Sequence, residues 1–152
     1  MSPARVTGIV LAGGRSTRFG EDKLGAEVRG RPLLHLAIDA VATIVDDVVV
    51  VIAPDGARPR LPADFEIPIR VVRDAEAGLG PLAGLAAGLA ATRAPLAILV
   101  GGDQPALQPA LLAELLLWLD PEVGEPSLDV VGLEEDGRLR PLPVALRVAT
   151  VR

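Results

Sequence analysis

The chain has 152 residues, no cysteine and a formal net charge of -5; half of its residues are apolar and only 2% are aromatic. This length predicts one domain over residues 1–152, with a core of Leu, Val, Ile and Ala. The absence of cysteine excludes disulfides, thiolate metal sites and a cysteine nucleophile, and it is typical of a cytoplasmic protein. The acidic balance argues against nucleic acid as a partner, since binding a phosphate backbone needs a broad basic face.

No stretch of the sequence predicts a membrane segment or a secretory signal. The N-terminal apolar run is too short for the apolar region of a signal peptide. The most apolar window, residues 79–91, is interrupted by glycines and by Pro81, and it falls short of the roughly 20 apolar residues that a membrane helix needs. We therefore expect a cytoplasmic protein that does not bind a membrane.

The first predicted element is a strand over Val6–Leu11, followed by Gly13 and Gly14. Glycines tolerate positive φ, so consecutive backbone N–H groups can point into one concavity and form a nest that binds anions. Basic side chains follow this turn at fixed offsets and would surround the anion. These are Arg15, Arg18 and Lys23.

The charge pattern points to a polyphosphate as the ligand of this loop. Lys23 is the only lysine of the chain, and a compact ammonium suits a phosphate oxygen. Residues 1–31 carry six basic and three acidic side chains, whereas the remainder carries nine and seventeen, so a small polyanion is drawn to this end. The loop matches neither the Walker pattern nor G-x-G-x-x-G. The alternative is a solvated glycine turn with chance charges.

The elements predicted after the loop alternate between helices and strands. Residues 47–53 form a β-branched run, which is typical of a strand covered on both faces of a parallel sheet. Gly84 and Gly88 lie one turn apart and would let their helix pack closely. In chain order we expect a helix over 32–44, strands over 47–53 and 69–73, a helix over 81–92, a strand over 97–100, a helix over 109–119, and strands over 129–133 and 139–146 joined through Asp136-Gly137.

This order predicts an α/β fold with three layers, built on a mainly parallel, right-handed, doubly wound sheet that is Rossmann-like. In such sheets ligands bind at the carboxyl ends of the strands. Gly13 and Gly14, Asp74 and Asp103 each follow a predicted strand. We therefore expect residues far apart in sequence to meet at one edge of the sheet.

Two aspartates are the candidate polar residues of that edge. Asp103, in GGDQPAL, is suited to hold Mg²⁺ opposite a phosphate loop, since Mg²⁺ favours one or two carboxylates with phosphate oxygens and water. The alternative is that Asp103 caps the next helix. Asp74 opens the segment DAEAGLGPLAGL, where Gly80-Pro81 could instead be a simple loop leading into a packed helix.

Three ordered motifs carry a resemblance to a known family. VTGIVLAGGRSTRFGEDK resembles the signature LAGGxSxRFGxDK of nucleotidyltransferases with a GT-A-like fold, most closely that of the molybdenum cofactor guanylyltransferases. GGDQPAL resembles the family's GDxPxL motif, and DAEAGLGPLAGL its D…GPLAG motif. The resemblance implies that the first loop holds a nucleoside triphosphate, that Asp103 is the metal ligand, and that Asp74 and the turn of the third motif approach the base and ribose. The implied nucleotide-binding residues are Leu11, Ala12, Gly13, Gly14, Arg18, Lys23, Asp74, Gly80, Pro81, Leu82 and Gly84.

The resemblance also implies a reaction. The protein would use GTP and Mg²⁺ to transfer GMP to the terminal phosphate of molybdopterin in the biosynthesis of the molybdenum cofactor, and would release pyrophosphate. Arg18, Lys23 and Asp103 would be its catalytic residues. A cytidylyl- or other nucleotidyltransferase of the same fold, or an inactive nucleotide-binding module, remains an alternative. The chain stops at Arg152, before the late strand whose NxNTP-like motif helps hold the metal in the family, so we expect a C-terminally shortened chain.

Other distinctive residues predict structural roles. His35 lies inside a helical stretch and is expected on the surface or packed, away from catalysis. Trp118 ends an apolar helix and is expected in the core. The segment RPLPVAL, residues 140–146, resembles the family's late strand on the acceptor side. The sequence leaves the oligomeric state open.

Overall fold

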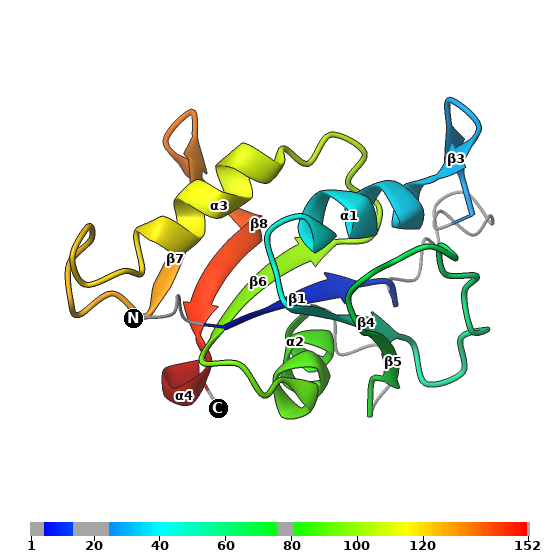
Figure 1. The fold of residues 1–152 in the computed structure, drawn as a ribbon, viewed down its shortest axis with the longest axis horizontal. Helices are drawn as coiled ribbons and strands as arrows, with labels where there is room; N and C mark the ends of the chain where they lie inside the picture. The colour runs from blue at the N-terminus through cyan, green and yellow to red at the C-terminus, as the bar shows by residue number, and fades with distance from the viewer. Residues whose placement is uncertain (1–4, 14–24, 76–80, 152) are drawn as a thin grey trace.

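The computed structural model describes residues 5–13, 25–75 and 81–151. Its main sheet has the strand order β5-β4-β1-β6-β8-β7 (Figure 1). The strands of this sheet are β1 (Val6–Leu11), β4 (Asp47–Ile52), β5 (Ile69–Arg73), β6 (Leu96–Gly101), β7 (Val130–Glu135) and β8 (Arg138–Arg147). A separate pair is formed by β2 (Glu27–Val28) and β3 (Arg31–Pro32), and the helices are α1 (Leu33–Ala42), α2 (Pro81–Ala91), α3 (Pro109–Leu117) and α4 (Val148–Val151).

The helices cover both faces of the sheet. Figure 1 shows α1 and α3 over one face and α2 and α4 over the other. The strand β4 explains this arrangement, because Val48 and Val50 join the apolar cluster under α1 and α3, while Val49 and Val51 join the cluster under α2. All four side chains are buried, so the predicted three-layer fold, with a strand covered on both faces, is confirmed.

The direction of the strands creates a switch point in the sheet. β1 pairs in parallel with β4 on one side and with β6 on the other. The chain passes from β1 through α1 to β4 and β5, and then crosses through α2 to β6 on the opposite side of β1. The predicted mainly parallel, doubly wound sheet is therefore confirmed. β8 and β7 complete it as an antiparallel hairpin whose turn, Asp136-Gly137, has φ values of 53° and 73°.

The helix α2 packs closely on the sheet through its glycines. A Cβ at Gly88 would lie 2.6 Å from Ile9 Cγ2, and one at Gly84 would lie 3.1 Å from Leu11 Cδ2. A larger side chain at Gly88 would push the helix outward from β1, whereas at Gly84 the terminal methyl of Leu11 would have to shift only slightly. The expected close packing through Gly84 and Gly88 is confirmed, and it places the start of α2 near the carboxyl end of β1.

Three features differ from the sequence prediction or add to it. The β2–β3 pair and the one-turn helix α4 were not predicted. The prediction of a core tryptophan is wrong, because Trp118 is 47% exposed. The buried stripe of this segment runs through Leu112, Leu115 and Leu119, which follow helical spacing, and Trp118 falls beside that stripe.

His35 has the packed role expected of it. It is half-buried in α1, and its Nε2–H donates a hydrogen bond of 2.8 Å to the carbonyl oxygen of Arg60. The side chain therefore ties the long connection between β4 and β5 to the helix. Within the described ranges, none of the helices has the length and apolar character that crossing a bilayer requires.

Asp47 organises a polar network at the amino end of β4, and its loss should destabilise the fold. Its carboxylate accepts hydrogen bonds of 2.6 Å from Thr7 Oγ1 and from Arg70 Nη2, and Thr7 is fully buried. Asp47→Ala leaves the Thr7 hydroxyl without this acceptor, so we expect the free energy of unfolding to fall by about 2 kcal/mol in urea denaturation. The control is Asp39→Ala, which breaks an exposed pair with Arg31 and should cost less than about 1 kcal/mol. Equal losses in the two variants would contradict a special role for Asp47.

Candidate functional site

The candidate site lies where the strand order reverses, between β1 and β6. Leu11 and Gly101 are register partners at the carboxyl ends of these strands. The N–H group of Gly102 donates a hydrogen bond of 2.8 Å to the carbonyl oxygen of Leu11. The segments that follow the two strands therefore leave the sheet side by side, at the position where open α/β sheets bind ligands.

Gly13 makes a close backbone approach at this edge. A Cβ at this position would lie 2.8 Å from the nitrogen of Ala53 and 3.1 Å from the carbonyl carbon of Ile52. These are backbone atoms at the end of β4 and cannot swing aside as a flexible side chain would. Only glycine fits here, so the start of the predicted phosphate loop is fixed against β4.

The need for glycine at position 13 can be measured as stability. Gly13→Ala should lower the free energy of unfolding by about 2 kcal/mol, because the new methyl group overlaps backbone atoms that the sheet holds in place. Gly84→Ala is the control, since its Cβ would meet side-chain methyl groups alone, Leu11 Cδ2 at 3.1 Å and Val51 Cγ1 at 3.8 Å, and the helix favours Ala over Gly by about 1 kcal/mol. A Gly13→Ala variant as stable as Gly84→Ala would show that the turn relaxes freely.

The structure places Asp103 beside this turn. Asp103 follows β6 and is exposed, and its Oδ1 lies 2.9 Å from the position that a Cβ on Gly101 would take. The helix α3 begins at Pro109 with Gln108 as its N-cap residue, so the alternative in which Asp103 caps the next helix is wrong. The carboxylate is therefore available to a ligand at the edge of the sheet.

Gln104 holds the turn that carries Asp103, and sequence reasoning missed this role. The ladder between β6 and β8 ends at the pair Leu99 and Val144, so β8 does not reach the N–H group of Gly101. The side chain of Gln104 takes that place, and its Oε1 accepts a hydrogen bond of 2.7 Å from the Gly101 N–H. The sequence signal was an amide side chain three residues after a strand end, where a backbone donor needs a partner.

Asp74 lies at the same edge but on the other side of β1. It is half-buried, and its N–H group donates a hydrogen bond of 2.8 Å to the carbonyl oxygen of Ile52. Three strand spacings separate β5 from β6, which amounts to about 14 Å. Asp74 and Asp103 are thus too far apart to hold one metal ion, whose oxygen ligands lie about 2 Å from it.

Some of the remaining predicted site residues lie near the carboxyl edge of the sheet, and others lie outside the described residues. Leu82, in the first turn of α2, is 76% exposed, and Ala12 is buried at the end of β1. Gly84 contacts the side chain of Leu11. Five predicted residues lie outside the described residues, and the full nucleotide-binding set remains a prediction. These five are Gly14, Arg15, Arg18, Lys23 and Gly80.

The carboxylate at the edge fits a magnesium ion shared with a phosphate ligand. Within the described residues there is no group of three or more His, Asp or Glu side chains that would hold a metal by itself. Magnesium keeps several waters and commonly binds one or two protein carboxylates together with phosphate oxygens. The exposed Asp103, next to the start of the glycine loop, satisfies this requirement.

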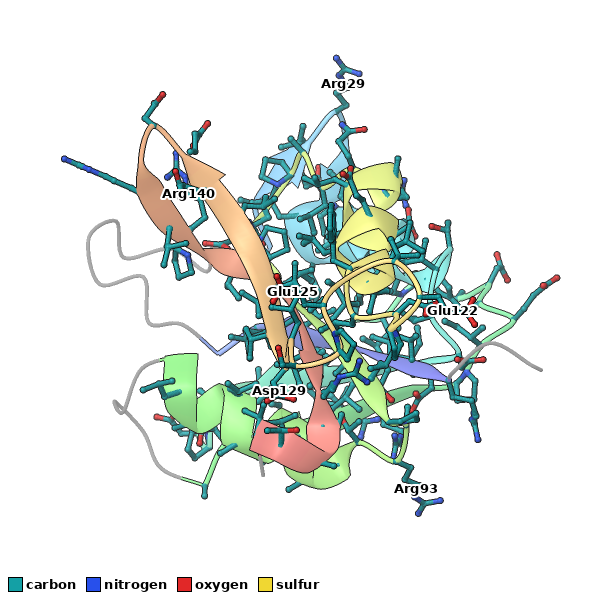
Figure 2. The ribbon with its side chains drawn as sticks, turned by 90° about the vertical axis from the view of Figure 1, so that its left-hand side faces the viewer. Arg29, Arg93, Glu122, Glu125, Asp129 and Arg140 are labelled. Carbon is teal, nitrogen blue, oxygen red and sulfur yellow. The ribbon has the colours of Figure 1, made fainter. Side chains whose placement is uncertain are left out.

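Three acidic side chains lie at the opposite end of the sheet from the candidate site. Figure 2 shows Glu122, Glu125 and Asp129 along the segment that leads from α3 into β7. β7 begins opposite Leu146, which pairs with Ala97 near the amino end of β6. This acidity is therefore remote from Gly13 and Asp103, so it opposes a polyanionic ligand at the carboxyl edge only weakly.

Comparisons with known proteins identify a family and relatives of this chain. The family described as "MobA-like NTP transferase domain" matches residues 8–151. A probable molybdenum cofactor guanylyltransferase of Chloroflexus aggregans is 37% identical over 145 residues, which cover 93% of this chain and 65% of the relative. The chain spans between 50% and 68% of the length of the first curated relatives that it matches.

Solved structures share the fold. The crystal structure of Rv0371c from Mycobacterium tuberculosis has a TM-score of 0.73 and 23% identity, and the match covers 99% of this chain and 75% of that one. Molybdopterin-guanine dinucleotide biosynthesis protein A from Archaeoglobus fulgidus has a TM-score of 0.68 and 19% identity over 95% of this chain and 69% of its own. With its family match over nearly the whole chain, and with Gly13 and Asp103 at the switch point of the sheet, the chain belongs to the family of MobA-like NTP transferase domains.

Proposed function

We propose that this protein transfers GMP from GTP to the terminal phosphate of molybdopterin in a Mg²⁺-dependent reaction that releases pyrophosphate. The observation that carries the proposal is the adjacency of two segments at the switch point. The start of the glycine loop and the turn of Asp103 are joined by the hydrogen bond from Gly102 to Leu11. Support for guanine and molybdopterin comes from relatives named molybdenum cofactor guanylyltransferase that match most of the chain.

The reaction requires no nucleophile from the protein. The acceptor phosphate is already anionic; one of its oxygens bonds to the α-phosphorus of GTP while the bond from that phosphorus to the bridging oxygen breaks and pyrophosphate leaves. The work of the chain is to position the two substrates and to neutralise charge. The loop amides, Arg18 and Lys23 would bind the leaving phosphates.

Asp103 would hold the metal ion of this site. Magnesium, when bound, supplies positive charge that stabilises the phosphate oxygens as pyrophosphate leaves. The turn held by Gln104 keeps the Asp103 carboxylate at the edge between β6 and β1. The nucleoside would extend across β1 towards Asp74 and the exposed Leu82 at the start of α2.

The test has two stages. Titration of the protein with GTP, CTP and ATP, with and without Mg²⁺, should show a clear preference for GTP with Mg²⁺. Purified molybdopterin should then cause release of pyrophosphate from GTP. Preferential binding of CTP would instead favour a cytidylyltransferase, and binding without pyrophosphate release would favour a nucleotide-binding module.

A further inference from the structure

A short turn after β4 lies at the same edge of the sheet as the candidate site. This turn, residues 53–56, closes through a hydrogen bond of 3.1 Å from the Gly56 N–H to the Ala53 carbonyl oxygen. Its first residue is the one that Gly13 approaches, since a Cβ on Gly13 would lie 2.8 Å from the Ala53 nitrogen. The 53–56 turn therefore begins at the carboxyl edge of the sheet, on the β4 side of β1.

One cationic side chain holds this turn. Arg73 Nη1 donates hydrogen bonds to the carbonyl oxygens of Ala53 at 3.3 Å, Pro54 at 3.0 Å and Gly56 at 2.7 Å. Hydrogen bonds from a charged donor are stronger than those between neutral groups. Three bonds to carbonyl groups so close in sequence leave the turn little freedom to change shape.

The backbone of Arg73 is fixed as well. It is the last residue of β5 and the register partner of Ile52 in β4. The next residue, Asp74, donates its N–H to the Ile52 carbonyl oxygen at 2.8 Å. The guanidinium group therefore extends from a rigid strand to a turn that strand pairing alone does not hold.

We propose that Arg73 is a positioning residue for the nucleoside half of the bound nucleotide, a role that rests on the proposed function. The order β5-β4-β1-β6 places Arg73 and the 53–56 turn on one side of β1 and Asp103 on the other. A nucleotide whose phosphates lie near Asp103 extends its ribose and base towards β4 and β5. Arg73 acts on that half through the 53–56 turn, without contact to the reacting atoms.

This placement predicts a selective defect. Removing the guanidinium group loosens the turn on the β4 side of β1, whereas the turn of Asp103, on the other side of β1, keeps its own hydrogen bond from the Gly101 N–H to Gln104 Oε1. KM for GTP should rise while kcat changes little, since the interaction lost is made equally in the ground state and in the transition state. Tripolyphosphate, which has no nucleoside, should bind as well as before.

The experiment compares three variants in the whole chain. Arg73→Ala should weaken GTP binding by about tenfold and leave the affinity for tripolyphosphate unchanged. Arg73→Lys should recover most of the GTP affinity, because an ammonium group carries a positive charge and three N–H donors that can replace those of Arg73 Nη1. The control is Arg70→Ala, which removes an arginine from the other end of the same strand, where it pairs with Asp47 at 2.6 Å. Its stability should fall, but its GTP affinity should match that of the wild type.

The outcomes separate this inference from the proposed function. A wild-type chain that binds no GTP overturns both. A wild-type chain that binds GTP, together with an Arg73→Ala variant of unchanged GTP affinity, overturns the inference alone. Equal weakening of GTP and tripolyphosphate, or equal weakening in Arg70→Ala, would also overturn it, because either result shows that only general stability was lost.

Discussion

Asp103→Asn is expected to reduce Mg²⁺-dependent turnover of GTP by about 10²–10³-fold with little change in the melting temperature. The carboxylate is exposed at the end of β6, so its charge contributes little to the stability of the fold. Two hydrogen bonds hold the turn around it: the Gly101 N–H donates to Gln104 Oε1, and the Gln104 N–H donates to the Gly101 carbonyl oxygen. Neither of these hydrogen bonds uses the Asp103 carboxylate. The substitution therefore removes a metal ligand from a turn that keeps its shape.

The measurement is GTP affinity with and without Mg²⁺, beside a melting curve. Asp136→Asn is the matched control, because it makes the same chemical change at an exposed aspartate of the β7–β8 turn. Its φ of 53° is one that Asn adopts readily. The control should behave as the wild type in every assay. Magnesium dependence that survives in Asp103→Asn would remove this residue from the metal site.

The fold could be predicted well because its elements have strong local signals. The β-branched run of β4 and the glycine spacing of α2 each predicted both the element and its packing. Asp136-Gly137 predicted the hairpin turn that the structure contains. By contrast, β2 and β3 have only two residues each, too few for a periodic pattern, and α4 is a single turn rich in β-branched residues.

The error at Trp118 has a simple geometric cause. α3 ends at Leu117, and the residue that turns into the core after it is Leu119, which is 1% exposed. A large apolar side chain was taken as buried because of its type, whereas its position relative to the stripe of Leu112 and Leu115 decides its exposure.

The sequence predicts those site residues that belong to a local motif. Gly13, Asp74 and Asp103 all follow strands, as expected, and the structure shows that Asp103 adjoins β1 while Asp74 lies two strands from β1 on its other side. The roles of Gln104 and Arg73 depend on backbone partners left exposed where a neighbouring strand or turn ends, and such partners are set by the register of the sheet. For Gln104 the local sign is an amide side chain three residues after a strand end, whereas the sequence near Arg73 carries no comparable sign.

Lys23→Ala is expected to lower kcat/KM for GTP by about 10²–10³-fold, since it removes a charge-assisted contact to the reacting phosphates. Lys23 lies outside the described residues, and this expectation is carried by the sequence. The lysine is unique in a chain that otherwise uses arginine for its positive charge. It also follows a glycine turn whose first residue, Gly13, is fixed at the switch point beside Asp103. Lys23→Arg should recover only part of the activity, because a planar guanidinium cannot replace a compact ammonium at one oxygen.

The variant Arg31→Ala is the control that shows whether Lys23 contacts the phosphates directly or only attracts them from a distance. It removes the same unit of positive charge from the basic N-terminal part of the chain, where Arg31 makes an exposed pair with Asp39. If Lys23 acted through the long-range field alone, both variants would lose activity to a similar extent and both losses would fade at high salt. A direct contact predicts a large loss in Lys23→Ala that persists in about 0.5 M salt and a nearly unchanged Arg31→Ala. Equal behaviour of the two variants would contradict the assignment of Lys23 to the phosphates.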